Sequence, residues 1–240
     1  TQNYGITDFD NYVSGWTTYQ IPVGQYYTGS SFFLVLVNDK DAGALNNNSR
    51  FRNVRIFEDT PGGGGSCTVD DDFEGAGAGT GWTTSGSCST GTFVLGNPTQ
   101  QTNSGVTTQV GGAASGSNAL FTATNTSAGN ADVDGGECVL TSPTFNVTTA
   151  SNLAVNYFHG QRDAGDDPGD DYFVLEYSTN GGTSYTSFVS IGDVQNNAAW
   201  TAAGVNGISG NVVLRVRVSD GAGPGDLVEG GIDDVSICEP

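Results

Sequence analysis

Five aspartates lie close together in the stretch RDAGDDPGDD, residues 162–171. They are Asp163, Asp166, Asp167, Asp170 and Asp171. Like charges at this spacing repel one another, so the stretch needs a counter-charge. Carboxylate oxygens are the ligands that calcium prefers, so a bound cation is one candidate. A basic partner and plain solvent are the other two.

A second acidic stretch, SDGAGPGDLVEGG at residues 219–231, also contains Asp220. Both stretches border predicted strands, and the two loops can lie at the same end of a β-sandwich. We therefore expect their carboxylates to lie close together. Without a cation, convergence would raise the carboxylate pKa values and loosen the loops. The alternative is a solvated acidic rim. The predicted ligands of a calcium cluster are Asp163, Asp166, Asp170, Asp171, Asp226 and Glu229.

Other segments give weaker signals. DVDGGE, residues 132–137, resembles part of an EF-hand loop but lacks its length and its closing glutamate spacing. The single histidine, His159, lies near Gln161 and Arg162 in YFHGQRD, and these three residues are candidates for a polar ligand contact. A structural histidine at a strand end is the alternative.

The sequence offers little for catalysis. No GxSxG nucleophile motif is present. One histidine without clustered cysteines does not fit a zinc enzyme. Glycoside hydrolysis by a pair of carboxylates stays an alternative, because it depends on the distance between the two carboxyl groups, which the sequence does not give.

The charge of the chain restricts its partners. The 240 residues carry 26 acidic and 7 basic side chains, for a net charge of −19. Such a surface repels phosphate backbones and anionic lipids, so we predict no nucleic-acid partner. No apolar run approaches the roughly 18 residues of a membrane helix, so we also predict no membrane insertion.

Four cysteines without CxxC spacing favour two disulfides and an oxidising compartment. Four unpaired buried thiols are the alternative. Of the three possible pairings we favour Cys67 with Cys238 and Cys88 with Cys138, because the first would tie together the two ends of one domain. We therefore expect a secreted, extracellular protein.

The elements that must position these residues are predicted to be strands. Apolar and β-branched runs are separated by glycine-rich turns, and no run has a helical period. STNGGTSY is predicted to be a hairpin turn. The pattern predicts an all-β, antiparallel β-sandwich of the jelly-roll type. The strand-like runs are residues 91–96, 118–125, 138–147, 152–160, 171–178, 186–192, 212–220 and 231–238.

The stretch EDTPGGGGSC marks a domain boundary, because proline followed by four glycines gives a flexible connector. We expect a partial β-sandwich unit at residues 1–60, a linker at 61–66 and a jelly-roll domain at 67–240. The chain starts at Thr1 without a methionine, so we expect a mature product or a fragment of a longer protein.

The segments DDFEGAGAGTGWTTSGSC, NALFTATN, CVLTSPTFNV, LEYSTNGGTSYTS and GGIDDVSIC resemble the jelly-roll modules of secreted bacterial peptidases and adhesins. This group includes MAM-like, immune-inhibitor-A-type and cleaved-adhesin domains, and it is related to carbohydrate-binding jelly rolls. The resemblance covers about residues 67–240. Residues 1–60 resemble the C-terminal half of a carbohydrate-binding-type module.

The resemblance implies a structural calcium ion shared between the first and last strands. Carried over by position, its ligands are Asp72 and Glu74 in the first strand and Asp233 and Asp234 in the last. Antiparallel first and last strands can lie close enough to share a cation. Turn and capping aspartates that face water are the alternative.

The resemblance further implies a non-catalytic, calcium-stabilised module that attaches a secreted enzyme or surface protein to a polymer, and the expected polymer is a polysaccharide. One alternative is an adhesive or self-assembling protein in which residues 1–60 pair with a neighbouring chain. The other is a glycan-degrading enzyme with paired carboxylates.

Overall fold

The computed structural model describes residues 66–124, 127–162, 169–221 and 226–240. The chain divides between Gly64 and Gly65 into two units, and the described residues belong to the second. The predicted β unit at residues 1–60, and its self-association, lie outside the described residues and stay predictions.

The described residues form strands and no helix, which confirms the all-β prediction. Within this part of the chain, therefore, no helix could cross a membrane. The strands are β1 (Cys67–Asp71), β2 (Thr83–Gly86), β3 (Val94–Gly96), β4 (Gln101–Asn103), β5 (Val106–Gln109), β6 (Ala119–Phe121), β7 (Gly136–Thr141), β8 (Phe145–Arg162), β9 (Tyr172–Ser178), β10 (Thr186–Ile191), β11 (Thr201–Asp220) and β12 (Leu227–Cys238).

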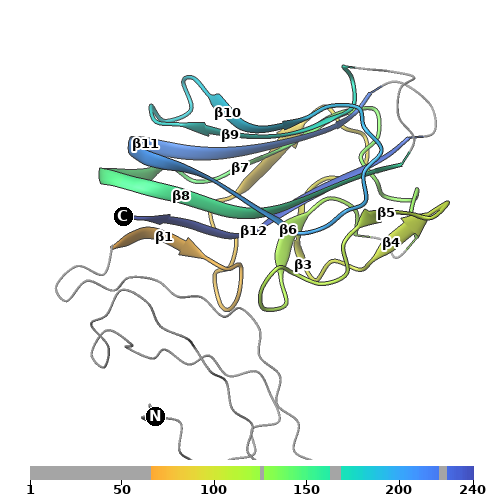
Figure 1. Ribbon diagram of the computed structural model, residues 1–240, viewed down its shortest axis with the longest axis horizontal. Helices are drawn as coiled ribbons and strands as arrows, with labels where there is room; N and C mark the ends of the chain where they lie inside the picture. Colours follow the sequence, from red (N-terminus) through yellow and green to blue (C-terminus); the bar gives the residue numbers. More distant parts are fainter. Residues whose placement is uncertain (1–65, 125–126, 163–168, 222–225) are drawn as a thin grey trace, which may run out of the picture. The chain divides into compact units, whose positions relative to one another are not determined.

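Most strands form one curled antiparallel sheet. Its main order is β10-β9-β11-β8-β12-β6-β3, with β1 beside β12, β7 beside β11 and β2 beside β7, and β4 and β5 form a separate pair. The long strand β11 pairs twice, through residues 201–212 with β8 and through residues 213–220 with β9 and β7. The sheet therefore turns back on itself, with β9, β10 and β7 in one layer and β8, β12 and β1 in the other (Figure 1). This arrangement is the jelly-roll-like fold expected from the sequence.

The hydrophobic core lies between the two halves of the sheet. Leu153 in β8, Leu175 in β9, Val216 in β11 and Ile232 in β12 all belong to one cluster, and none is more than 1% exposed. Alternate residues of a strand point to opposite faces, so Leu153 and Val155 of β8, for example, both point into this core. Each such burial contributes roughly 1.5–3 kcal/mol to folding.

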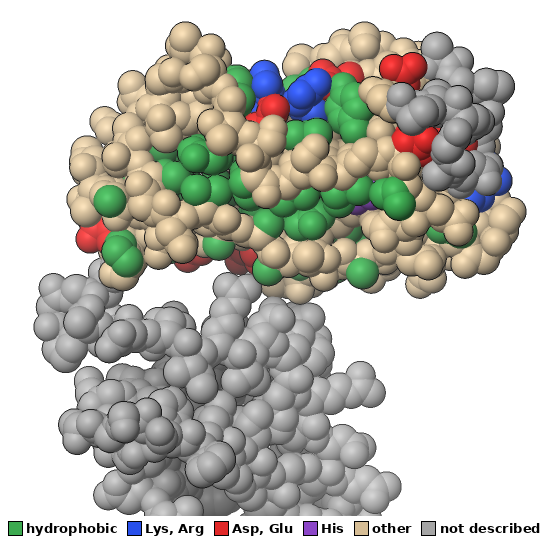
Figure 2. Space-filling view, turned by 45° about the horizontal axis from the view of Figure 1, so that its top comes forward, with side chains coloured by type: hydrophobic (Ala, Val, Ile, Leu, Met, Phe, Trp, Pro, Cys, Tyr) green, Lys and Arg blue, Asp and Glu red, His purple; other side chains and the backbone are tan. Residues whose placement is uncertain are grey.

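Ion pairs cover the opposite face of the β9, β11 and β7 layer. Arg215 Nη2 lies 2.6 Å from Glu176 Oε2, and Arg217 Nε lies 2.6 Å from Glu137 Oε2. Basic and acidic side chains are adjacent on the face drawn in Figure 2. Arg215 and Arg217 are therefore neutralised by their neighbours on the same layer.

The sequence and the structure differ in some strand boundaries. Residues 138–147, expected as one run, form the end of β7 and the start of β8, with Pro143 between them. Proline lacks an N–H group for the ladder and therefore interrupts the strand. The first half of β11, TAAGVNGISGN, was not expected as a strand, since its glycines and small residues give no clear apolar alternation.

The structure contains two disulfides, Cys67–Cys238 and Cys88–Cys138, the same pairs that the sequence favoured. Cys67 lies opposite Cys238 in the register of β1 and β12. The first and last strands of the described unit are thus linked covalently as well as by pairing.

We expect the two disulfides to differ in their effect on stability. Their sequence separations are 171 and 50 residues. In the chain-entropy treatment, replacing both cysteines of a pair with serine should lower the free energy of unfolding by about 5 kcal/mol for Cys67–Cys238 and about 4 kcal/mol for Cys88–Cys138. Urea unfolding of the two double variants measures this. An unfolding free energy equal to that of the parent protein would show that the bond contributes nothing.

Candidate metal centre

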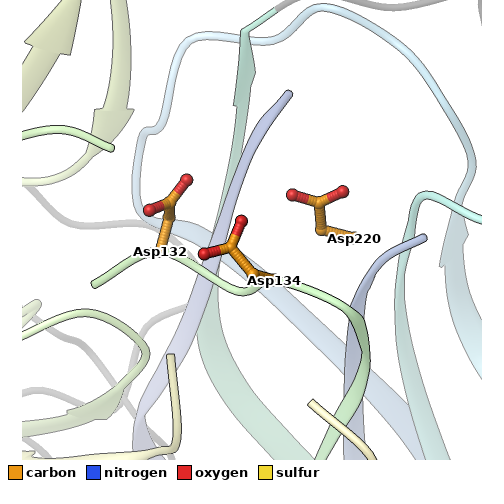
Figure 3. Close-up of side chains that lie close together, drawn as sticks. All are labelled: Asp132, Asp134 and Asp220. Atoms are coloured by element: carbon orange, nitrogen blue, oxygen red, sulfur yellow. The ribbon is translucent and has the colours of Figure 1, made fainter. Parts of the chain in front are cut away.

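Three aspartates from two segments approach one another at the edge of the fold. Asp132 and Asp134 precede β7, and Asp220 is the last residue of β11. One carboxylate oxygen of each lies within 4.8 Å of those of the other two. Figure 3 shows the three carboxyl groups around a common space. Among the described residues, this is the group of three that could hold a metal ion.

The backbone pairing of Val133, which lies between them, sets the positions of Asp132 and Asp134. Val133 forms a bridge with Val228 of β12, and both side chains are fully buried in the core. Side chains alternate along an extended segment, so Asp132 and Asp134 lie together on the side away from Val133.

Strand register brings Asp220 to the same place. Asp220 lies opposite Gly136 where β11 pairs with β7, two residues beyond Asp134. Asp134 is held in turn by a bridge with Thr90, whose Oγ1 donates to Asp134 Oδ2 at 2.7 Å. The group therefore depends on the pairing of β11 with β7.

The buried oxygens of this group lack donors. Asp132 and Asp220 are each 2% exposed, and Oδ1 of each accepts no hydrogen bond within the described residues. Glu229, 1% exposed, likewise has an unpartnered Oε1, while its Oε2 accepts from Thr122 Oγ1. Asp134, in contrast, is exposed. A buried oxygen without a donor is unfavourable unless another positive group compensates it.

The raised pKa values of the buried carboxyl groups also indicate that a positive group would stabilise this cluster. Burial, and then the charge of Asp171, raises the pKa of Asp220 to about 8. Burial, and then Asp134, raises the pKa of Asp132 to about 6, an effect that Arg162 partly opposes. Burial also raises the pKa of Glu229 well above its usual value. In the metal-free protein at neutral pH, Asp220 therefore holds a proton that a cation would displace.

The ligand set is made of oxygen atoms only. Carboxylates suit hard cations such as calcium and magnesium, whereas zinc sites in proteins use histidine and cysteine. Asp132 and Asp220 are buried, whereas Asp134 is exposed to solvent. The arrangement can hold a hard divalent cation.

The two acidic stretches singled out in the sequence do meet. Asp171 Oδ1 accepts from the Gly221 backbone N–H at 3.0 Å, and a Cβ atom on Gly221 would lie 2.3 Å from that of Asp170. Asp226 and Glu229 are buried beside them, 4% and 1% exposed. Asp163 and Asp166 lie outside the described residues.

Sequence reasoning gave too little weight to Asp132 and Asp134. Their signal was the DVDGGE segment, which was interpreted as an incomplete EF-hand loop. The third carboxylate of the group, that of Asp220, comes from β11 rather than from the same loop, and a sequence spacing does not reveal this.

The aspartates predicted as a calcium site in the last strand contact a loop. A β-bulge in β12 accommodates Asp234, whose φ is 50°. Asp233 Oδ2 accepts from the backbone N–H groups of Ala114 and Ser115 at 2.8 and 3.0 Å. Asp234 Oδ2 accepts from Asn156 Nδ2 at 2.7 Å. Burial raises the pKa of Asp233 to about 7.

The predicted first-strand ligands make similar contacts. Glu74 Oε1 accepts from the backbone N–H groups of Ser117 and Asn118, both at 2.5 Å, and Asp72 Oδ1 accepts from the N–H of Glu74 at 3.0 Å. Glu74 and Asp233 thus fasten the two ends of residues 114–118. A calcium ion at these residues stays a prediction.

The residues predicted as ligand contacts lie on β8. His159 is 1% exposed, and its ring packs 5.8 Å from that of Phe173. Gln161 is fully buried, and its Nε2 donates to Asp171 Oδ2 at 2.9 Å and to Asp193 Oδ1 at 3.0 Å. Both side chains are therefore in the interior and offer no surface to a ligand. Arg162 lies near Asp132, whose pKa it lowers.

We expect the stability of the calcium-free protein to fall as the pH rises from about 5 to about 8. The pKa values of Asp132 and Asp220 are raised in the folded protein to about 6 and about 8, from 3.8. A raised pKa stabilises the fold below the unfolded-state value, and this contribution is lost as the pH passes the folded-state value. Thermal unfolding in a chelator, measured across this range, tests the expectation.

Asp220→Asn, which resembles the protonated form, should flatten this pH dependence, and the exposed Asp70→Asn should leave it unchanged. An equal pH dependence in the parent protein and Asp220→Asn would contradict the assignment to Asp220.

No protein-family model and no curated protein matches the chain. Solved structures of two kinds are distantly similar to it. The K1 cleaved adhesin domain of Lys-gingipain from Porphyromonas gingivalis W83 is 12% identical, with 73% of this chain and 99% of that chain covered and a TM-score of 0.46. The CBM22-1 xylan-binding domain of Xyn10C from Paenibacillus barcinonensis is 14% identical, with 72% and 94% covered and a TM-score of 0.38. A family 61 carbohydrate-binding module in complex with β-1,4-galactotriose is 15% identical, with 67% and 90% covered and a TM-score of 0.40.

Proposed function

We propose that the described unit is a calcium-stabilised, non-catalytic extracellular module that attaches a larger protein to a polysaccharide. The observation that carries the calcium assignment is the group of Asp132, Asp134 and Asp220, with carboxylate oxygens within 4.8 Å of one another and two of them buried without donors. Calcium accepts six to eight oxygens in irregular geometry, whereas magnesium demands a near-ideal octahedron. An irregular set from two segments suits calcium better.

Other features support an extracellular location. Two disulfides link strands of the described unit. Disulfides persist in oxidising compartments, where calcium is also plentiful enough to fill sites of moderate affinity. The net charge of −19 disfavours polyanionic partners, which leaves neutral polymers as the better ligands.

The composition of the aspartate group supports a binding role over hydrolysis. Glycoside hydrolases typically place a pair of carboxyl groups on either side of the scissile bond of the bound sugar. Here three carboxylates, those of Asp132, Asp134 and Asp220, have oxygen atoms within 4.8 Å of one another. Such a group favours a cation held between the carboxylates over a sugar held between them.

We expect calcium to raise the melting temperature of the protein. A ligand at 1,000 times its Kd stabilises the folded state by about 4 kcal/mol, which corresponds to about 8–16 °C for a domain of this size. Asp220→Asn should remove most of this rise, because it removes the negative charge of a ligand and one of its two carboxylate oxygens. Asp70→Asn, an exposed change of the same charge, should keep it.

The same series separates the two predicted calcium sites. A rise that is retained in Asp220→Asn but lost in Asp233→Asn would assign the ion to the first and last strands. Equal melting temperatures in calcium and in a chelator would refute calcium stabilisation.

We also expect the calcium-loaded protein to bind at least one neutral polysaccharide. Affinity electrophoresis against xylan, β-1,4-galactan, mannan and a soluble β-glucan measures this, with anionic alginate as the comparison. Retardation by a neutral polymer and not by alginate is the expected result. No retardation by any polymer would argue against the polysaccharide role and would leave the calcium assignment unaffected.

A further inference from the structure

A pocket lies directly beside the metal centre. Its volume is about 330 Å³, at the lower end of the range for small-molecule sites, and it is open to solvent, so a short segment of a ligand can lie in it. Its walls come from the chain before and within β3, the end of β6 and the approach to Asp132. The lining includes Thr90, Thr92, Val94, Ala123, Thr124 and Ala131.

The pocket and the metal centre share one wall. Thr90 lines the pocket, and its Oγ1 lies 2.8 Å from the carbonyl oxygen of Asp132 and 2.7 Å from Asp134 Oδ2. Gly91 also lines the pocket, and a Cβ atom there would lie 2.6 Å from the Asp132 carbonyl oxygen and from the backbone of Val133. The segment that contains Thr90 and Gly91 therefore packs against the backbone of Asp132 and Val133, with no room for a side chain at Gly91.

The metal centre leaves coordination positions open. Three carboxylates supply three to six oxygens, and calcium takes six to eight. Asp132 and Asp220 are buried, but Asp134 is exposed, so the outer side of a bound ion faces solvent next to the Thr90 wall. The open positions require neutral oxygen ligands, supplied by water or by a bound molecule.

The chemistry of the pocket indicates which molecule fits. Its threonine hydroxyl groups both donate and accept hydrogen bonds, and its alanine and valine side chains give apolar contacts. None of the residues lining it is charged. A sugar ring presents the same combination of hydroxyl groups and apolar C–H faces, and two adjacent hydroxyls can bind one calcium ion together. The negative charges of Asp171 and Asp226, which act on Asp220, disfavour an anionic sugar at the ion.

We propose that this pocket is a calcium-bridged subsite for a neutral sugar, in which two adjacent hydroxyl groups complete the coordination of an ion held by Asp132, Asp134 and Asp220. The inference rests on the proposed function and adds to it the place and the mode of polysaccharide binding. Calcium then has two effects, since it joins β11 to the segment before β7 and also contacts the ligand.

Terbium luminescence tests the bridge directly. Tb³⁺ shares calcium's preference for oxygen ligands, and its emission lifetimes in H₂O and D₂O count the water molecules bound to it. Soluble oligosaccharides of xylan, β-1,4-galactan and mannan are added to the Tb³⁺-loaded protein. A bound sugar should remove about two of the coordinated waters. Binding of an oligosaccharide with no change in the water count would overturn the bridge.

Variants test the pocket independently of the metal. Thr92→Trp fills the pocket and should weaken oligosaccharide binding at least about tenfold, as expected when one or two hydrogen bonds are lost. Its melting temperature should still rise with calcium. Thr186→Trp, an exposed change of the same size on β10, should bind as the parent protein does.

The outcomes separate this inference from the proposed function. Oligosaccharide binding that persists in Thr92→Trp, or in a chelator with the protein still folded by circular dichroism, would place the sugar elsewhere and overturn the inference alone. Calcium stabilisation with no binding of any oligosaccharide would overturn the inference together with the polysaccharide role.

Discussion

The double pairing of β11 is the constraint on which the rest of the structure depends. One continuous strand pairs with β8 along its first half and with β9 and β7 along its second. Because a strand this long belongs to both halves of the sheet, it fixes how they face each other and encloses the core between them. It also determines where its last residue, Asp220, emerges. The candidate metal centre is therefore a consequence of the same pairing that forms the core.

The placement of charge follows from this arrangement. Val133 and Val228 are drawn into the core, and the alternation of side chains then leaves Asp132 beside Asp134 and next to the end of β11. Burying several carboxylates together is unfavourable, and the raised pKa values of Asp132 and Asp220 express that cost. A cation would convert the same repulsion into a link between segments that are distant in the sequence.

Carboxylates act differently elsewhere in the fold. Glu74 and Asp233 accept hydrogen bonds from backbone N–H groups at the two ends of residues 114–118. Glu176 and Glu137 instead pair with arginines on the outer face of the sheet. The role of each acidic residue thus depends on which hydrogen-bond donors the strands bring to it. A carboxylate that has other carboxylates as neighbours instead of donors is the one that a bound cation would stabilise.

The sequence by itself determined the class of fold and its chemical limits. Apolar and β-branched runs such as 171–178 and 212–220 are local features, so the strands they form and the hairpin between β9 and β10 could be predicted, whereas the short strands β2, β4 and β5 could not. Only the tertiary structure decided which carboxylates meet. Asp134 and Asp220 are far apart in the chain, and the register of β11 against β7 alone brings them together. The large number of acidic residues in the sequence predicted that some carboxylates would lie close together. Which ones do so depends on strand register, which is set by packing of the core and is not encoded in a short motif.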